Sequence, residues 1–387
     1  MTQPFMSVAM LALLAGGVGP APMRAQSVTV PLTAGRWRAS DSIRFENYLG
    51  RPSLYINKGV ALASDIDVRN GTIEFDMAAT KQTNFLGVAF HAKALDFSED
   101  VIFRVGLSGT SEAMQYAPAF NDYGIAWQIY HGDGSNAVAT LTREQWMHVK
   151  VVLSGARALV FLNDSVKPTL VVPRLAGAGG GAIGVWGGNF GRGAYYSNIR
   201  YTIDPSSAAP ASSAPVSAVT TPRGTITDWD LSEIFNAPAL VPGRRPDLAA
   251  VTWQRVRTEP AGFVLINRYR HAPAVDPPAD PVTHEILADS VMGGRVAGTK
   301  VVFARASIES DRDRIARLRF GYSDGLVIYA NGEPLYFGAS PFGFRPVGNM
   351  ETDGEAVFLH LKKGHNSIVF AVTEYFGGWG FWARLDP

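Results

Sequence analysis

Two acidic residues, Glu74 and Asp76, lie two positions apart in the segment GTIEFDMAA (71–79). Three apolar residues alternate with them: Ile73, Phe75 and Met77. Because successive side chains of a strand point to opposite faces, both carboxylates should project away from the core. A pair of carboxyl groups can hydrolyse a glycosidic bond, one as general acid and the other as nucleophile or base. The alternative is that both acids simply belong to a solvated strand face.

A second group combines planar polar side chains with aromatic rings within a short stretch of chain. Its members are Arg104, Gln115, Tyr116, Trp127, Gln128, Tyr130 and His131. Sugars need flat rings for their C–H faces and amide or guanidinium groups for their paired hydroxyls. Strand alternation sets Arg104, Gln128 and Tyr130 opposite their apolar neighbours, so we expect these three on a concave ligand-binding surface and Trp127 in the core. The alternative is an internal hydrogen-bond network that braces the sheet.

The segment TEYFGGWGFWARL (373–385) holds a weaker pair of candidates, Glu374 and Trp379. A turn at Gly377 and Gly378 could present Trp379 at the rim of a domain as a platform for a sugar ring. The alternative is that Trp379 anchors the last strand in the core.

The sequence predicts no metal-binding motif. The histidines of the first half, His91, His131 and His148, lack the spacing of a zinc site, and the chain contains no cysteine. We therefore expect no cofactor, although a structural calcium ion held by backbone carbonyls and an Asp is compatible with the sequence.

Charge and composition narrow the class of protein. Lys and Arg number 35 against 34 Asp and Glu, for a net charge of +1, so no strong field favours nucleic acid. Hydrophobic residues make up 47% and charged residues 18%, which excludes a mostly disordered chain. Glycine and proline together account for 64 of 387 residues, which favours many turns between short strands.

The chain starts with an apolar run of 14 residues, FMSVAMLALLAGGV (5–18), followed by APMRAQS (21–27). The run is too short to span a bilayer and fits a secretory signal covering residues 1–25, cleaved near Ala25–Gln26. No later segment predicts a membrane span. We therefore expect an exported protein, periplasmic or extracellular.

Residues 205–222, PSSAAPASSAPVSAVTTP, contain only Pro, Ser, Ala, Thr and Val. This composition cannot build a hydrophobic face and predicts an extended linker. It divides the mature chain into two domains, residues 26–204 and 223–387. Both consist of runs of five to eleven residues with period-2 alternation and turn residues between them, such as WMHVKVVLSG (146–155) and SIVFAVTEY (367–375). The fold class is therefore all-β, with two antiparallel β-sandwich (jelly-roll) domains.

The segment VIFRVGLSGTSEAMQYAPAFNDYGIAWQIYHGDG (101–134) resembles secreted bacterial proteins with a concanavalin-A-like or laminin-G jelly roll, a group that includes the 3-keto-disaccharide hydrolase family. The resemblance extends through GTIEFDMA, HVKVVLSGARALVFLND and GAIGVWGG and covers most of residues 28–203. The second half is similar to a galactose-binding-like jelly roll through FGYSDGLVIYANG, LKKGHNSIVFAVTE and FGGWGFWARL. Both resemblances imply carbohydrate recognition.

Laminarinase-type glucanases share the concanavalin-like fold and carry an E-x-D-x-x-E strand. Glu74 and Asp76 match its first two acids, but Ala79 stands where the third would be. The residue that would protonate the leaving group is therefore missing, which argues against that mechanism.

These observations predict an exported protein that binds a poly- or oligosaccharide through the concave face of the first sandwich. One alternative is a glycoside-acting enzyme, a hydrolase or lyase, that uses Glu74 and Asp76 or a set of Arg104, Tyr130 and His131. The other alternative is an envelope or adhesion module that binds protein.

Overall fold

The computed structural model describes residues 26–120, 125–177, 179–188, 192–204, 219–236, 246–271, 300–340, 345, 348–352, 354–374 and 377–386. The predicted signal segment, residues 1–25, lies outside the described residues, as does most of the predicted linker, residues 205–218. Among the described residues, no helix is long and apolar enough to cross a membrane.

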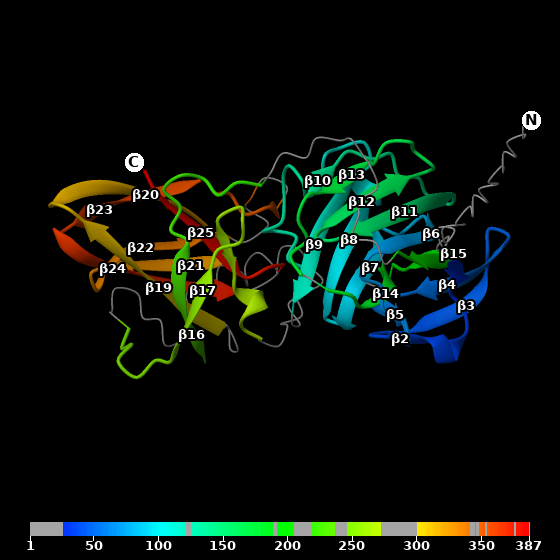
Figure 1. Cartoon of the computed structure of the whole chain (residues 1–387), viewed down its shortest axis with the longest axis horizontal. Helices are drawn as coiled ribbons and strands as arrows, with labels where there is room; N and C mark the ends of the chain where they lie inside the picture. Colours follow the sequence, from blue (N-terminus) through cyan, green and yellow to red (C-terminus); the bar gives the residue numbers. More distant parts are fainter. Residues whose placement is uncertain are drawn as a thin grey trace, which may run out of the picture.

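The first half of the chain folds into two antiparallel sheets (Figure 1). The eight-stranded sheet has the order β13 (Leu170–Val172), β12 (Arg157–Leu162), β11 (Trp146–Ser154), β6 (Gly71–Ala79), β15 (Ala194–Ile203), β4 (Arg51–Ile56) and β3 (Ile43–Tyr48), with β1 (Ser27–Thr29) paired to β15. The seven-stranded sheet has the order β10 (Asn136–Ala137), β9 (Met114–Phe120), β8 (Phe97–Arg104), β7 (Phe85–Ala94), β14 (Ala182–Gly187), β5 (Gly59–Ala63) and β2 (Trp37–Ala39).

The second half also folds into two antiparallel sheets. The six-stranded sheet has the order β17 (Trp253–Arg257), β16 (Asp228–Asn236), β19 (Lys300–Ser310), β24 (Gly364–Glu374), β21 (Gly325–Ala330) and β22 (Glu333–Ala339). The four-stranded sheet has the order β18 (Phe263–Leu265), β25 (Gly380–Leu385), β20 (Arg314–Ser323) and β23 (Glu355–Leu361). Helical structure in the described part of the chain is limited to short 3-10 turns, among them η1 (Ala34–Arg36), η2 (Val105–Leu107) and η4 (Ile266–Arg268).

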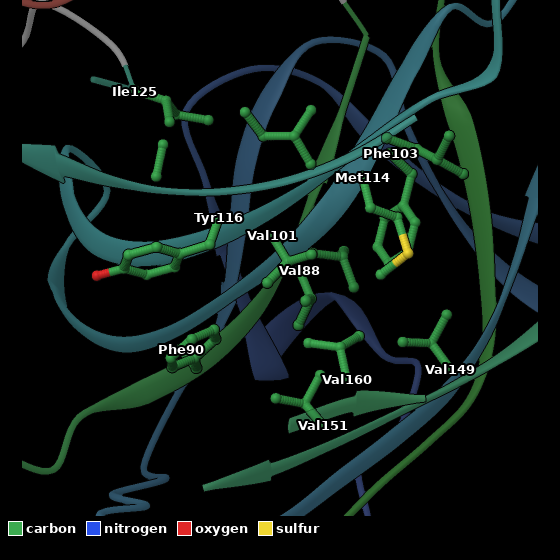
Figure 2. Close-up of a cluster of buried hydrophobic side chains, with 14 of the residues drawn as sticks. Val88, Phe90, Val101, Phe103, Met114, Tyr116, Ile125, Val149, Val151 and Val160 are labelled. Atoms are coloured by element: carbon green, nitrogen blue, oxygen red, sulfur yellow. The ribbon is translucent and has the colours of Figure 1, made fainter. Parts of the chain in front are cut away.

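Each half has a core formed between its two sheets, which confirms the predicted all-β fold class. In the first half, the alternation of β6 buries Ile73, Phe75 and Met77 completely, as predicted. Figure 2 shows how the two sheets of this half pack together: side chains of β7, β8 and β9 point toward Val149, Val151 and Val160 of the facing sheet. In the second half, the largest completely buried side chains of the core are Trp229, Phe320, Phe370, Trp379 and Phe381.

The hairpin of β21 and β22 turns at Asn331 and Gly332, which both adopt positive φ (51° and 88°). Asn-Gly is the pair that a two-residue hairpin turn favours, so this turn could be predicted from the sequence. The pairing of the two strands shifts register between Ile328 and Tyr329, so that Tyr329 lies opposite Pro334. As a result, β22 forms an irregular outer edge of the six-stranded sheet.

Residues 125–131 differ from the prediction. The sequence IAWQIYHG alternates like a strand, but in the structure residues 127–129 form turns that pack against β9. The Ala126 amide donates to the Pro118 carbonyl (2.8 Å), and the Gln115 side chain donates to the Trp127 carbonyl (2.7 Å). The alternation used to place Gln128 and Tyr130 on one face therefore does not apply.

The two halves of the chain lie side by side and are in contact (Figure 1). Four apolar side chains of the second half join the core cluster of the first: Phe263, Leu265, Met350 and Trp382. Polar contacts cross the same boundary, because the Met350 amide donates to the Gln128 carbonyl (2.7 Å) and Arg268 donates to the Ala176 carbonyl (2.8 Å). The halves therefore share part of one apolar core.

Candidate functional site

Glu74 and Asp76 lie together on the outer face of the eight-stranded sheet, as the strand alternation predicts. The carboxylate of Asp76 accepts hydrogen bonds from Arg51 Nη1 (2.5 Å), His148 Nδ1 (2.8 Å) and Asn198 Nδ2 (2.6 Å). Its partners come from β4, β11 and β15, so three strands fix one carboxylate. Asp76 is therefore a fixed centre of the face rather than a freely solvated acid.

Glu74 lies two residues before Asp76 on β6 and is held in a similar way. Arg200 Nε donates to its carboxylate (2.9 Å), and His148 Nε2 lies 3.7 Å from its other oxygen. The hydrogen bond from Arg200 is the largest influence and lowers the pKa of Glu74. A general acid for glycoside hydrolysis needs the opposite, a raised pKa. These contacts fix the positions of five side chains, which form an ion-paired cluster of Glu74, Asp76, His148, Arg51 and Arg200.

A row of aromatic side chains crosses the same face beside this cluster. Strand pairing sets Trp146 of β11 opposite Ala78, Ala78 opposite Tyr195, and Tyr195 opposite Tyr55. Tyr48 stacks on Tyr195 with ring centroids 3.8 Å apart and meets Trp146 edge-on at 6.0 Å. All four rings are half-buried, so each presents part of its surface to solvent.

Two guanidinium groups pack on rings of the aromatic row. Arg51 lies over the Trp146 ring at 5.2 Å, and Arg44 lies over the Tyr55 ring at 4.1 Å. Arg51 also binds Asp76, and it therefore connects the aromatic row to the ion-paired cluster. The result is a surface of rings, guanidinium, carboxylate and imidazole groups whose positions are set by their mutual contacts.

The polar residues predicted to line a concave binding face lie in the interior instead. Arg104, Gln115, Tyr116, Gln128 and Tyr130 are all buried, with exposed fractions of 0% to 8%. Arg104 does point away from Phe103, as predicted, but it donates to the Glu112 carbonyl (3.1 Å) and to the side chain of Gln115. Gln115 in turn holds the 125–131 segment. This geometry matches the alternative, an internal hydrogen-bond network. Contact between these buried residues and a sugar stays a prediction that the structure does not favour.

The remaining members of that set face the second half of the chain. Tyr116 donates to the buried carboxylate of Glu99, and Tyr130 packs edge-on between Tyr116 and Phe263. His131, also named as a catalytic candidate, bonds through Nε2 to the Met350 carbonyl (2.6 Å), and burial lowers its pKa.

Gln128 and Glu374 were predicted in separate halves, and the structure brings them into one buried cluster. The Gln128 amide oxygen accepts from Arg345 (2.5 Å) and from Ser323 (3.1 Å). Arg345 also pairs with Asp324 at 2.9 Å. Burial and the nearby Asp324 raise the pKa of Glu374. This clamp cluster of Gln128, Ser323, Asp324, Arg345 and Glu374 joins the halves and has almost no exposed surface.

Trp379 belongs to the core, as the alternative interpretation predicts, and it forms no platform at the rim. Its exposed fraction is 0%, and its indole nitrogen donates to the Val372 carbonyl (3.1 Å). The reason is local: its amide is bound by Asn267 and its carbonyl by Ile266, which pins the segment against the second sandwich.

Two buried acids escaped the sequence analysis because nothing in the pattern FSEDVIF separates them from exposed ones. Burial raises the pKa of Glu99 to about 7, although Tyr116 and the Gly177 amide donate to its carboxylate. Burial likewise raises the pKa of Asp100 to about 8, and Ser98 is its one hydrogen-bond donor among the described residues.

These two acids contribute a loss of stability as the pH rises from 5 to 8. Their pKa values exceed the ordinary values of 4.5 and 3.8, so the native state binds more protons than the unfolded state in this range. The stabilisation is complete below the unfolded pKa and is lost as the pH passes the folded one. Urea unfolding at pH 5 and pH 8 measures this slope. Asp100→Asn should flatten it, and an unchanged slope would contradict the assignment.

Among the described residues, no group of three His, Cys, Asp or Glu side chains is arranged to hold a metal ion. The compatibility of the sequence with a structural calcium ion stays a prediction.

No family model and no curated protein sequence matches the chain. Solved structures do resemble parts of it. The carbohydrate-binding module CBM66 from Bacillus subtilis is 12% identical, covers 42% of this chain and 93% of its own, and has a TM-score of 0.31. The β-glucanase of Bacillus licheniformis is 13% identical, covers 47% and 99%, and also has a TM-score of 0.31. A protein of unknown function with a galectin-like fold from Bacillus subtilis is 10% identical, covers 43% of this chain and 89% of its own, and has a TM-score of 0.32. Because these sequence identities and TM-scores are low, a function has to be argued from the side chains of this chain.

Proposed function

We propose that this protein binds carbohydrate on the outer face of the eight-stranded sheet. The observation that carries the proposal is the half-buried aromatic row, Trp146, Tyr195, Tyr55 and Tyr48, beside a cluster of fixed polar groups. Sugar rings bind through C–H contacts to aromatic faces and through hydroxyl contacts to planar polar groups. This face offers both, whereas the predicted set around Arg104 is enclosed.

Preorganisation supports recognition of a sugar by this face. Because Arg51 is held by Asp76 and by the Trp146 ring, little side-chain freedom is lost when a ligand binds. The carboxylates and guanidiniums alternate, so the face has little net charge and suits a neutral or mildly acidic glycan.

The same geometry favours binding over hydrolysis by the pair Glu74 and Asp76. The pKa of Glu74 is lowered, and Ala79 at the third position of the glucanase pattern is buried and has no acidic group. A glycoside-acting enzyme or a protein-binding module remains the alternative. Export to the periplasm or beyond, where polysaccharides are met, is part of the proposal.

Trp146→Ala tests the proposal. We expect it to weaken binding of the best glycan from an array of neutral and acidic polysaccharides about tenfold or more, equivalent to about 1.4 kcal/mol, because a sugar platform is lost. Isothermal titration calorimetry measures the affinity. Trp186→Ala is the matched control, since Trp186 is also half-buried but lies on the other sheet of the same sandwich. Equal losses in both variants, or none in Trp146→Ala, would refute the site.

A further inference from the structure

A cleft of about 700 Å³ lies on the outer face of the six-stranded sheet in the second half of the chain. Its floor is formed by β19, β24 and β21, and its walls include Trp253 of β17 and the segment 246–249. The volume falls within the range of sites that enclose small ligands. No candidate residue from the sequence lies in it.

The floor of this cleft changes from apolar to polar along the strands. At the apolar end, Leu248 and Trp253 line the cleft and pack on a buried cluster that includes Phe303. In the middle, Arg305 and Tyr329 flank Val369. At the polar end, Ser367, His365 and Asn331 line the cleft. A ligand lying along the floor would meet C–H surface at one end and hydrogen-bonding groups at the other.

The Arg305 side chain is fixed in position, but only part of its hydrogen-bonding capacity is used. Its Nε donates to Asp230 (3.1 Å), and its guanidinium lies over the Trp253 ring at 4.1 Å. Its two terminal nitrogens make no hydrogen bond with any residue that the structure describes. A rigid guanidinium with two available donors can bind a pair of neighbouring hydroxyl groups.

Two further side chains in the cleft, Tyr329 and His365, have polar atoms that are available for hydrogen bonds to a ligand. Tyr329 is 2% exposed, yet its hydroxyl, on a side chain that lines the cleft, has no hydrogen-bond partner within the described part of the chain. His365 uses Nδ1 for Glu309 (3.1 Å) and Ser307 (2.9 Å), which leaves Nε2 for a ligand. In the first sandwich, by contrast, the buried polar groups of Arg104 and Gln115 bond to each other.

We propose that this cleft is a second carbohydrate site, which takes a neutral oligosaccharide. Trp253, Leu248 and Val369 suit the C–H faces of sugar rings, and the hydrogen-bonding groups of Arg305, Tyr329 and His365 suit hydroxyl groups. A neutral ligand follows from the charge: Asp230 offsets Arg305, and Asp247 adds a negative charge at the wall. The proposal does not depend on the aromatic row of the first sandwich.

The test is calorimetry on the full chain carrying Trp146→Ala, which disables the first proposed site. The probes are cellohexaose, laminarihexaose, xylohexaose and mannohexaose, with hexagalacturonate as the acidic comparison. At least one neutral hexasaccharide should bind, and Arg305→Met should weaken that binding tenfold or more. Tyr329→Phe, which removes only the hydroxyl group, should weaken it about threefold to tenfold.

Phe358→Ala is the control, because Phe358 is exposed on the other sheet of the same half. It should leave the affinity unchanged, and thermal melts should show that each variant is folded. The absence of binding by all four neutral probes, or binding that survives both Arg305→Met and Tyr329→Phe, would overturn the second site. Tighter binding of hexagalacturonate would overturn the neutral class. None of these results bears on the first site, which Trp146→Ala tests in the otherwise unchanged protein.

Discussion

Replacing Arg345 by Met should lower the free energy of unfolding by about 3–5 kcal/mol, the usual loss when one partner of a buried ion pair is removed. Arg345 is 7% exposed and pairs with Asp324, which is 2% exposed. Without the guanidinium, the Asp324 carboxylate stays buried beside Glu374 with no compensating charge. Methionine keeps most of the side-chain volume, so the loss measures charge rather than packing. Urea unfolding at pH 7 gives the value.

Two comparisons make this result specific to the clamp cluster. The double variant Arg345→Met with Asp324→Asn should recover much of the lost stability, because the unpaired charge is then removed as well. Arg255→Ala, which breaks ion pairs with Asp228 and Asp230 at a 65% exposed side chain, should cost less than about 1 kcal/mol. A loss below about 1 kcal/mol in Arg345→Met would show that the clamp contributes little to stability.

Trp379→Ala should destabilise the protein by about 3–5 kcal/mol, the cost of removing a large buried aromatic side chain. Trp379 is completely buried in the core of the second sandwich and its indole nitrogen is satisfied by the backbone. Truncation would leave a cavity in the core of the second sandwich. Differential scanning calorimetry of the full chain measures the change.

If Trp379→Ala does not fold, Trp379→Phe keeps part of the ring volume and should show a smaller loss in the same direction. Glycan binding offers the decisive contrast. A folded variant that keeps its full stability but loses binding would restore the platform interpretation of Trp379.

Strand alternation made the fold and one part of the candidate site predictable. The pattern of GTIEFDMAA fixes which side chains are buried, and it correctly places Glu74 and Asp76 on the outer face. Their partners could not be found in this way, because Arg51, His148 and Asn198 lie 25, 72 and 122 residues from Asp76. Strand order, which the local pattern does not encode, brings them together.

The wrong placement of Gln128 and Tyr130 has a related cause. Apolar residues alternate in IAWQIYHG because the segment is buried on several sides, partly by the second half of the chain. The partner of Gln128, Arg345, lies 217 residues away. The cleft at Tyr329 was missed because it is lined by one to three residues from each of several strands, none of which forms a local motif.

The irregular outer strand β22 has a consequence for self-association. An unpaired strand edge offers backbone groups to which another molecule can add a strand, and Leu335 and Phe337 expose apolar surface there. Pro334 lacks an amide hydrogen, Glu333 adds charge, and the register shift opposite Tyr329 distorts the edge. The protein therefore carries at this edge the features that discourage intermolecular sheet formation at high concentration.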